Sequence, residues 1–285
     1  MKSTYTSISL GAGRQSTALY LGCSLGLPGF PRADWAIFGD TMHELPDTYR
    51  HLDNLEAWAR ENGGIPIYRR SLGDLWKGAI EGGVHRKDTE KKKITTTLPY
   101  FMKKPDGSQG FMRRQCTAEY KIRVIKRTIR EILDIGPRSN VRNIEVTCLI
   151  GISLDEAHRM KDSDAKWLLN AYPLVDARLT VNDCAGICRK HIGYVPTKSA
   201  CIFCPFHGND FWKWMKEERP EQFEKACRFD EEIRRPEVRE LARMTSIPYI
   251  HRSMIPLRDV RFGDEHQMQL FDEQFGNDCS GHCGV

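Results

Sequence analysis

The chain has 285 residues, of which 40% are hydrophobic and 28% are charged, and its formal net charge is +5. These values are typical of a globular protein, so disorder throughout the chain is not expected, and the length suffices for one large α/β domain with a small appendage. Because no apolar run approaches the ~20 residues of a membrane helix, and no apolar secretion segment follows Met1, we expect a cytoplasmic protein without membrane contact.

Short β-prone segments alternate with helical patterns over the first two thirds of the chain. Strands are expected at residues 5–10, 35–38, 65–68 and 146–152. Helices are expected at residues 14–21, 46–58 and 117–135. This alternation predicts an α/β fold with a mainly parallel sheet and helices on both of its faces.

The pattern is interrupted twice. Residues 81–114 are rich in glycine, lysine and threonine and predict a mobile excursion, and after Arg178 the alternation stops. We therefore expect a nucleotide-binding domain at 1–178 and a Cys-rich, mostly helical, metal- or cluster-binding region at 179–285.

A glycine turn follows the first expected strand, in the segment Ser9-Leu10-Gly11-Ala12-Gly13-Arg14-Gln15-Ser16-Thr17. Glycines let the backbone approach an anion, and the N–H groups and dipole of the following helix favour negative charge there. The spacing is neither that of a Walker A loop nor that of the dinucleotide fingerprint. The turn predicts a phosphate site, although a tight turn without a ligand would have the same residues.

The turn resembles the PP-loop of ATP pyrophosphatases, whose signature is Ser-Gly-Gly-x-Asp-Ser. Ser9, Gly11 and Ser16 correspond to that signature, and Gln15 stands near its acidic position. The resemblance implies an adenine nucleotide alpha hydrolase-like fold that binds ATP with magnesium. The residues implied to hold the nucleotide are Ser9, Gly11, Gly13, Arg14, Gln15, Ser16, Thr17 and Asp40.

Two later segments resemble the adenylyl-sulfate and phosphoadenylyl-sulfate (PAPS) reductases. The segment Asp40–Tyr49 is similar to their Asp-Thr-Gly-x-x-Phe-Pro-Glu-Thr-Tyr motif, with agreement at Asp40, Thr41, Pro46, Thr48 and Tyr49. The segment Gly151–Arg159 is similar to their Gly-Ile-Arg…Glu-Ser…Arg motif, with Ser153 in place of the first arginine. The matches occur in the family's order, so the resemblance is to a PAPS reductase-like PP-loop enzyme.

Ten cysteines are unusual in a reducing compartment and point to metal or redox chemistry. Cys201-Ile202-Phe203-Cys204-Pro205 places two thiolates at a spacing that can bind one metal or cluster. Reductases of this group that carry a 4Fe-4S cluster bind it with a Cys-Cys pair and a later Cys-x-x-Cys, and here Thr117 replaces the second cysteine of the pair. The resemblance thus implies a cluster on Cys116, Cys201 and Cys204, with Cys188 as the first choice for a fourth ligand.

The alternative is a structural zinc, whose four-thiolate spacing is satisfied by Cys184, Cys188, Cys201 and Cys204. His207 can replace one thiolate in either site, or be only a polar neighbour. An open iron is also consistent with the family, because some tRNA-thiolating enzymes hold a cluster with three cysteines. Three further cysteines lie in apolar patterns and are expected in the core: Cys23, Cys148 and Cys227.

The chain ends in Cys279-Ser280-Gly281-His282-Cys283-Gly284-Val285. A thiolate among small residues is a candidate nucleophile, and the similar reductase tail attacks sulfur through its cysteine, so Cys283 is a candidate catalytic residue. A frayed terminus without a role is the alternative. Arg113 and Arg114, beside Cys116, are candidate catalytic contacts to phosphate or sulfonucleotide anions.

The function implied by the resemblance is ATP-dependent sulfur transfer. ATP adenylates a substrate oxygen, pyrophosphate leaves, and a sulfur nucleophile from a donor protein displaces AMP. The charge of +5 and the basic excursion slightly favour a tRNA or DNA substrate. Two alternatives stay open: a sulfonucleotide reductase that acts through Cys283, and a non-catalytic nucleotide-sensing or DNA-binding accessory protein with structural zinc.

Overall fold

The computed structural model describes residues 2–82, 98–136, 139–141 and 143–262. At its centre is a sheet of five parallel strands in the order β3-β2-β1-β6-β7. These strands are β1 (Ser3–Ser9), β2 (Trp35–Gly39), β3 (Ile67–Arg70), β6 (Ile144–Ile150) and β7 (Leu168–Ala171). The predicted α/β class and parallel sheet are confirmed.

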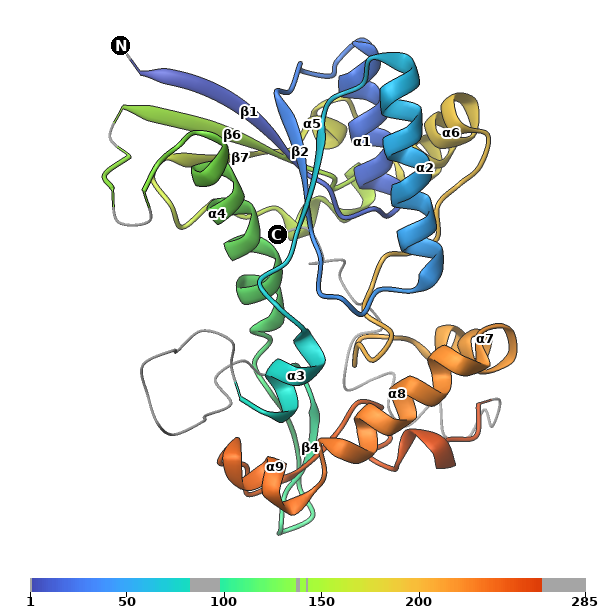
Figure 1. Cartoon of the computed structure of the whole chain (residues 1–285). Helices are drawn as coiled ribbons and strands as arrows, with labels where there is room; N and C mark the ends of the chain where they lie inside the picture. The colour runs from blue at the N-terminus through green and yellow to red at the C-terminus, as the bar shows by residue number, and fades with distance from the viewer. Residues whose placement is uncertain (1, 83–97, 137–138, 142, 263–285) are drawn as a thin grey trace.

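Helices cover both faces of this sheet (Figure 1). One face is covered by α1 (Arg14–Leu25), α2 (Pro46–Asn62), α5 (Pro173–Asp176) and α6 (Val181–Ile192). The other face is covered by α4 (Arg123–Ile132). Successive strand residues point to opposite faces, so Phe38 packs in the first of these cores and Ile37 in the second.

The order of the strands reverses at β1. Strands β2 and β3 lie on one side of it and β6 and β7 on the other, and Ser9 at its end is in register with Ile37 and Ile150. In open parallel sheets, ligands bind where the order reverses, beyond the carboxyl ends of the strands. The glycine turn therefore lies at the place where this fold class binds ligands.

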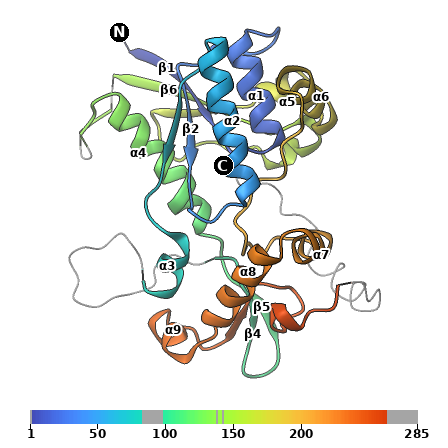
Figure 2. The same ribbon diagram turned by 45° about the vertical axis from the view of Figure 1, so that its right-hand side comes forward.

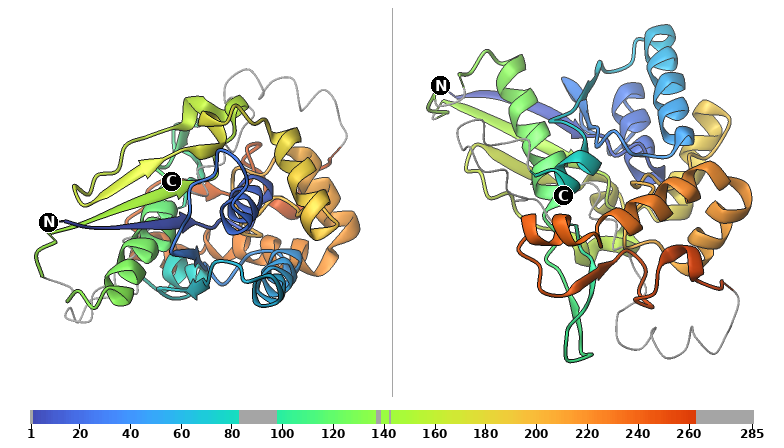
Figure 3. Two further views of the ribbon diagram at one scale, coloured as in Figure 1. Left: turned by 90° about the horizontal axis from the view of Figure 1, so that it is seen from above. Right: turned by 60° about the horizontal axis from the view of Figure 1, so that its bottom comes forward.

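The second body of the structure lies below the carboxyl edge of the sheet in the view of Figure 2, and it comes forward in the right-hand view of Figure 3. Its helices are α3 (Leu75–Ile80), α7 (Asn209–Glu218), α8 (Pro220–Glu232) and α9 (Pro236–Leu241). An antiparallel sheet joins them, formed by β5 (Gln109–Phe111), β4 (Phe101–Lys103) and β8 (Ile247–Tyr249). Its core combines Leu45, Tyr100 and Tyr120 with Trp212 and Phe229, so it draws residues from both sides of position 178.

Several local expectations from the sequence differ from the structure. The excursion at 81–114 contributes β4 and β5, while residues 83–97, including Arg86, Lys87 and the lysines at 91–93, lie outside the described residues. The helix expected at 117–135 starts as a π-helix, η1 (Ala118–Ile122), before α4. Short 3-10 helices form at η2 (Leu154–Arg159) and η3 (Leu257–Asp259).

The three cysteines expected in the core are buried, with exposed fractions of 4% for Cys23, 3% for Cys148 and 1% for Cys227. Burial raises the pKa of each thiol to about 12. None of the helices in the described part of the chain combines the length and apolar character needed to cross a bilayer.

Gly151, directly after β6, lies against the start of α1. A Cβ atom on Gly151 would be 2.7 Å from both the Cα and the backbone nitrogen of Ser16. No side-chain rotation can relieve that overlap, because the atoms it meets belong to the backbone. The absence of a side chain at Gly151 therefore sets how closely β6 and the glycine turn approach.

We predict that Gly151→Ala destabilises the protein by about 1–3 kcal/mol, because the turn and the end of β6 must separate. Gly186→Ala is the matched control, since a Cβ on Gly186, in the middle of α6, meets no atom within 4 Å. That variant should gain about 0.5–1 kcal/mol from helix propensity. Urea unfolding measures both, and equal effects at the two glycines would contradict the close approach.

Candidate functional site

The glycine turn leads into α1 with its N-terminal N–H groups directed past the end of β1. Ala12 takes a left-handed conformation, with φ of 57°, and Gly13 is the N-cap. The Gly13 N–H donates to Ser16 Oγ over 3.2 Å, and Ser16 Oγ in turn donates to the Gly13 carbonyl over 3.1 Å. The first turn of α1 contains no acidic residue, so the positive end of its dipole is available to an anion.

The predicted nucleotide residues of this segment differ in how far they are already engaged by the protein. Thr17 is fully buried, and its Oγ1 lies 2.9 Å from His51 Nε2, so it holds α1 against α2. Ser9 is also buried, at the end of β1. Gln15 reaches across to the segment after β6, where its Nε2 donates to Glu156 Oε2 over 2.8 Å. Gly11, Gly13 and Arg14 lie in the turn itself or at the first position of α1.

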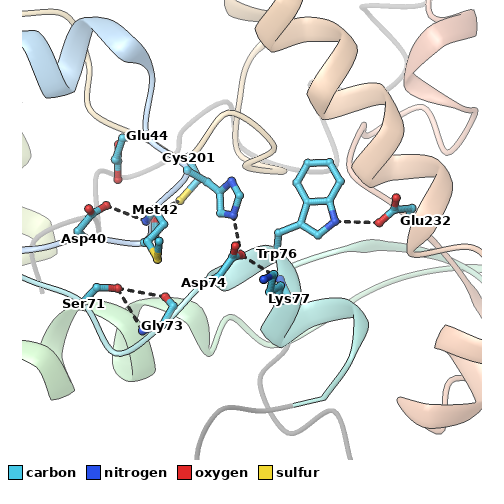
Figure 4. A network of polar contacts seen from close by, with 12 residues as sticks. Asp40, Met42, Glu44, Ser71, Gly73, Asp74, Trp76, Lys77, Cys201 and Glu232 are labelled. Carbon is cyan, nitrogen blue, oxygen red and sulfur yellow. Dashed lines mark hydrogen bonds and ion pairs between the residues drawn. The ribbon is translucent and has the colours of Figure 1, made fainter.

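Asp40 follows β2 at the same edge of the sheet. Its Oδ1 accepts a hydrogen bond from the Met42 N–H, over 2.7 Å (Figure 4), and a second from the Tyr49 hydroxyl, over 2.8 Å. Met42 has φ of 66°, a left-handed conformation that favours glycine, and it stands where the similar reductase motif has glycine. The Asp-Thr-Met turn thus has the backbone shape that a glycine-containing motif would favour.

A buried ion pair lies beside this turn and was not predicted from the sequence. Lys121 Nζ is 3.3 Å from Glu44 Oε1, and Ser199 Oγ donates to Glu44 Oε2 over 3.0 Å. Gly39 allows the approach, because a Cβ there would lie 3.1 Å from the Tyr120 carbonyl oxygen. Such a cluster cannot be found from sequence spacing, since Glu44, Lys121 and Ser199 lie on three separate segments.

The Cys-x-x-Cys loop packs against both of the other loops. Cys201 and Glu44 form an isolated antiparallel bridge, in which the Ile202 N–H donates to the His43 carbonyl over 2.8 Å. Its upstream neighbour Ser199 lies against the glycine turn, at 3.6 Å from a Cβ placed on Gly13. Three stretches far apart in sequence therefore meet at the carboxyl edge.

Aromatic packing holds the Cys-x-x-Cys loop in place. The Phe203 ring stacks on Phe229 of α8 with 4.0 Å between centroids, and His207 stacks on Phe211 at the same distance. The backbone turns through a hydrogen bond from the Cys204 N–H to the Cys201 carbonyl, and His207 Nε2 donates to that same carbonyl over 2.8 Å. In this structure His207 therefore supports the loop through its backbone.

The predicted metal cysteines lie in two places. Cys116 and Cys201 both pack against the core of the second body, and Thr41 Oγ1 lies 3.1 Å from Cys201 Sγ. Burial, followed by the charge of Glu44, raises the pKa of Cys201 well above its ordinary value, and a thiolate at Cys116 would raise it further. Cys184 and Cys188 instead lie in the core with α1, where Cys188 Sγ donates to the Arg14 carbonyl over 3.6 Å.

Within the described residues, no group of three or more His, Cys, Asp or Glu side chains is arranged to hold a metal ion. Cys279 and the candidate nucleophile Cys283 lie outside those residues. Of the two candidate arginines, Arg114 has its guanidinium 5.3 Å from the centre of the Phe206 ring, next to the Cys-x-x-Cys loop. Arg113 is exposed beside it.

His43 and Asp74 form a second pair that the sequence analysis missed. His43 Nε2 lies 2.7 Å from Asp74 Oδ1, and the imidazole packs against Trp76 and Phe203. Burial opposes ionisation of Asp74, but the hydrogen bonds from His43 and from the Lys77 N–H outweigh it and lower its pKa. The Asp74 carboxylate therefore fixes the orientation of the imidazole.

Two cavities border the site. One, of about 510 Å³, lies between α4 and the ends of β1, β6 and β7, and it reaches Ser9. The other, of about 420 Å³, lies between the first turns of α2 and residues of α8, and His43 is part of its wall. Both volumes are in the range that accommodates a small molecule.

No protein-family model matches the chain, and no curated protein and no solved structure matches it. We therefore infer the protein's function from its fold and from the side chains gathered at the carboxyl edge of the sheet.

The burial of His51, which contacts Thr17, predicts how the free energy of unfolding depends on pH. Burial lowers the pKa of His51 to about 4 from 6.5. Between these values the unfolded chain binds a proton that the folded chain does not. The folding free energy that depends on neutral His51 is therefore fully present above pH 6.5 and is lost progressively as the pH falls toward 4. His51→Gln should reduce the pH dependence of the unfolding free energy by about 1.4 kcal/mol per pH unit between pH 5 and 6.

Urea unfolding at several pH values measures this slope. A slope that His51→Gln leaves unchanged would show that His51 is protonated in the folded protein.

Proposed function

We propose that this protein is a PAPS reductase-like PP-loop enzyme that binds ATP with Mg²⁺ and activates a substrate by adenylation for sulfur transfer. The observation that carries the proposal is the meeting of three loops at the reversal of strand order: the glycine turn, the Asp40 turn and the Cys-x-x-Cys loop. A phosphate-binding turn and thiols side by side are what coupled ATP and sulfur chemistry requires.

The N-terminus of α1 is the phosphate site in this proposal. Its N–H groups and dipole favour the triphosphate, and Arg14 at the first helical position adds a cation. The 510 Å³ cavity that reaches Ser9 is large enough for the nucleoside. Hard carboxylate oxygens suit Mg²⁺, and Asp40 provides one at the edge of the sheet.

The chemistry proceeds in two steps. The acceptor oxygen attacks the α-phosphorus of ATP, the bond to the β-phosphate oxygen breaks, and pyrophosphate leaves. A sulfur nucleophile then displaces AMP from the adenylated acceptor. Arg114, whose guanidinium lies over Phe206 next to the Cys-x-x-Cys loop, and its chain neighbour Arg113 would neutralise the charge that develops on the phosphoryl oxygens.

The cysteines fit a metal site only in part. Cys116, Cys201 and Cys204 lie on segments that pack together, whereas Cys188 is occupied in the core beneath α1, and the described residues hold no complete ligand group. A 4Fe-4S cluster on the first three thiols, with zinc as the alternative, is therefore part of the proposal, and neither step above depends on it. When bound, an open iron of a cluster would carry the sulfur to be transferred.

For the acceptor we propose a nucleic acid, tRNA or DNA, in the cytoplasm, with a sulfur donor protein as a further partner. The net charge of +5 is compatible with a polyanionic substrate.

The decisive experiment measures pyrophosphate release from Mg·ATP by anaerobically purified protein, with tRNA, with duplex DNA and with neither. We expect release that one nucleic acid stimulates. Arg14→Gln should weaken ATP binding by roughly tenfold or more, because it removes a charge-assisted phosphate contact. Arg60→Gln, in the exposed last turn of α2, is the matched control and should bind ATP as the wild type does.

Other outcomes identify the alternatives. Sulfite release from adenylyl sulfate with a thiol donor, lost in Cys283→Ser, would replace the proposal with a sulfonucleotide reductase. Stoichiometric zinc together with nucleotide binding but no turnover would indicate an accessory protein. Iron and sulfide analysis of the same preparation tests the cluster directly.

A further inference from the structure

The cavity of about 420 Å³ beside α2 borders two of the three loops that meet at the carboxyl edge of the sheet. Met42, His43 and Glu44, from the turn after β2, line it together with Ile202, which lies between the two cysteines of the Cys-x-x-Cys loop. Ser199, whose hydroxyl donates to Glu44, lies against the third loop, the glycine turn. A molecule in this cavity would therefore lie beside the Cys-x-x-Cys loop and close to the glycine turn.

The charges that line the cavity balance one another. Its two carboxylates, Glu44 and Asp53, are each already in an ion pair. Its two cationic side chains are Arg50, which pairs with Asp47 outside the cavity, and Lys225. Because the lining carries no net charge, the cavity favours an uncharged group over a phosphate or a metal ion.

Met42 provides an apolar surface at this cavity. At 52% exposed it is the most exposed large apolar side chain among the described residues. Its φ of 66° is a left-handed conformation that a residue with a side chain disfavours and that glycine adopts freely. Such strained positions concentrate where a ligand is held. A flexible, polarisable thioether at this place suits the face of a flat aromatic ring.

Helix α8 provides the polar part of the lining. Gln222 and Lys225 lie three residues apart, and therefore on one face of this helix. Neither side chain has a hydrogen bond or an ion pair with any other residue that the structure describes. The carboxamide of Gln222 can donate and accept at the edge of a ring, and the ammonium group of Lys225 can bind a phosphate.

We propose that this cavity receives a single nucleobase of the nucleic-acid acceptor, turned out of its strand. Met42 packs against the base, Gln222 forms hydrogen bonds with its edge, and Lys225 binds a neighbouring phosphate. A nucleobase is flat, uncharged and bordered by donors and acceptors, as the lining of the cavity requires. This inference rests on the proposed function, because it places the acceptor of that reaction.

The test measures binding of a labelled single-stranded RNA of about 12 nucleotides, the DNA of the same sequence and both duplexes, by fluorescence anisotropy without ATP. We expect one of the single strands to bind at least about tenfold more tightly than its duplex. A base in a duplex must first be unpaired and unstacked before it can enter the cavity, and that step costs free energy.

Met42→Gly tests the contact with the base. It should weaken binding of the preferred strand by roughly tenfold or more, because the base no longer removes the methionine side chain from water. Glycine suits the left-handed backbone at this position, so the melting temperature should not fall, and misfolding cannot account for the loss.

Lys225→Gln tests the contact with the phosphate. It should weaken binding and lower the slope of log K against log salt concentration by about one. Lys190→Gln is the matched control, because it makes the same change at an exposed position of α6 outside the cavity, and it should keep the wild-type slope.

Equal binding of single strands and duplexes, or wild-type binding by Met42→Gly, would overturn the inference. So would binding of free UMP or CMP as tight as that of the strand, since the cavity would then be a site for small molecules. Pyrophosphate release that a nucleic acid stimulates, together with unchanged binding by Met42→Gly, would refute the inference alone. If the wild type binds neither RNA nor DNA in any form, the nucleic-acid acceptor of the proposed function fails and the inference fails with it.

Discussion

The structure depends most on one backbone contact, between Gly151 at the end of β6 and Ser16 in the first turn of α1. Parallel strands bring their carboxyl ends to one edge, but they do not set how closely the following loops approach. With no side chain at Gly151, the segment after β6 lies directly on the start of α1. Gln15 can then reach Glu156, and Arg159 can remain buried behind it.

The second constraint is the core of the second body, which holds the Cys-x-x-Cys loop at the carboxyl edge of the sheet. Phe203, between the two cysteines, stacks on Phe229, while the backbone on either side pairs with His43 and contacts the glycine turn. The aromatic packing of Phe203 on Phe229 therefore has a consequence for the candidate site, because it positions two thiols beside the glycine turn. In the function we propose, sulfur chemistry and nucleotide chemistry share this edge of the sheet.

Local patterns in the sequence were enough to predict the parallel sheet, four of its five strands and the glycine turn, because each depends on neighbouring residues, whereas β7 was not predicted. Local patterns could not predict contacts between segments that are distant in the sequence. The Glu44–Lys121 pair joins the segment before α2 to η1, and the His43–Asp74 pair joins that same segment to the start of α3. Thr17, predicted as a ligand residue, instead contacts His51 inside the protein. Nor could spacing show that Cys188 packs under α1 while Cys201 packs with Thr41.

The central claim is that the turn at 11–16 and the segment at 151–156 form one nucleotide site. Hydrogen–deuterium exchange with and without Mg·ATP tests it most directly, because backbone N–H groups at the start of α1 should become protected when they bind phosphate. We expect protection in both segments and none in α9, which lies in the second body. Protection confined to the second body, with exchange at 11–16 unchanged, would contradict it.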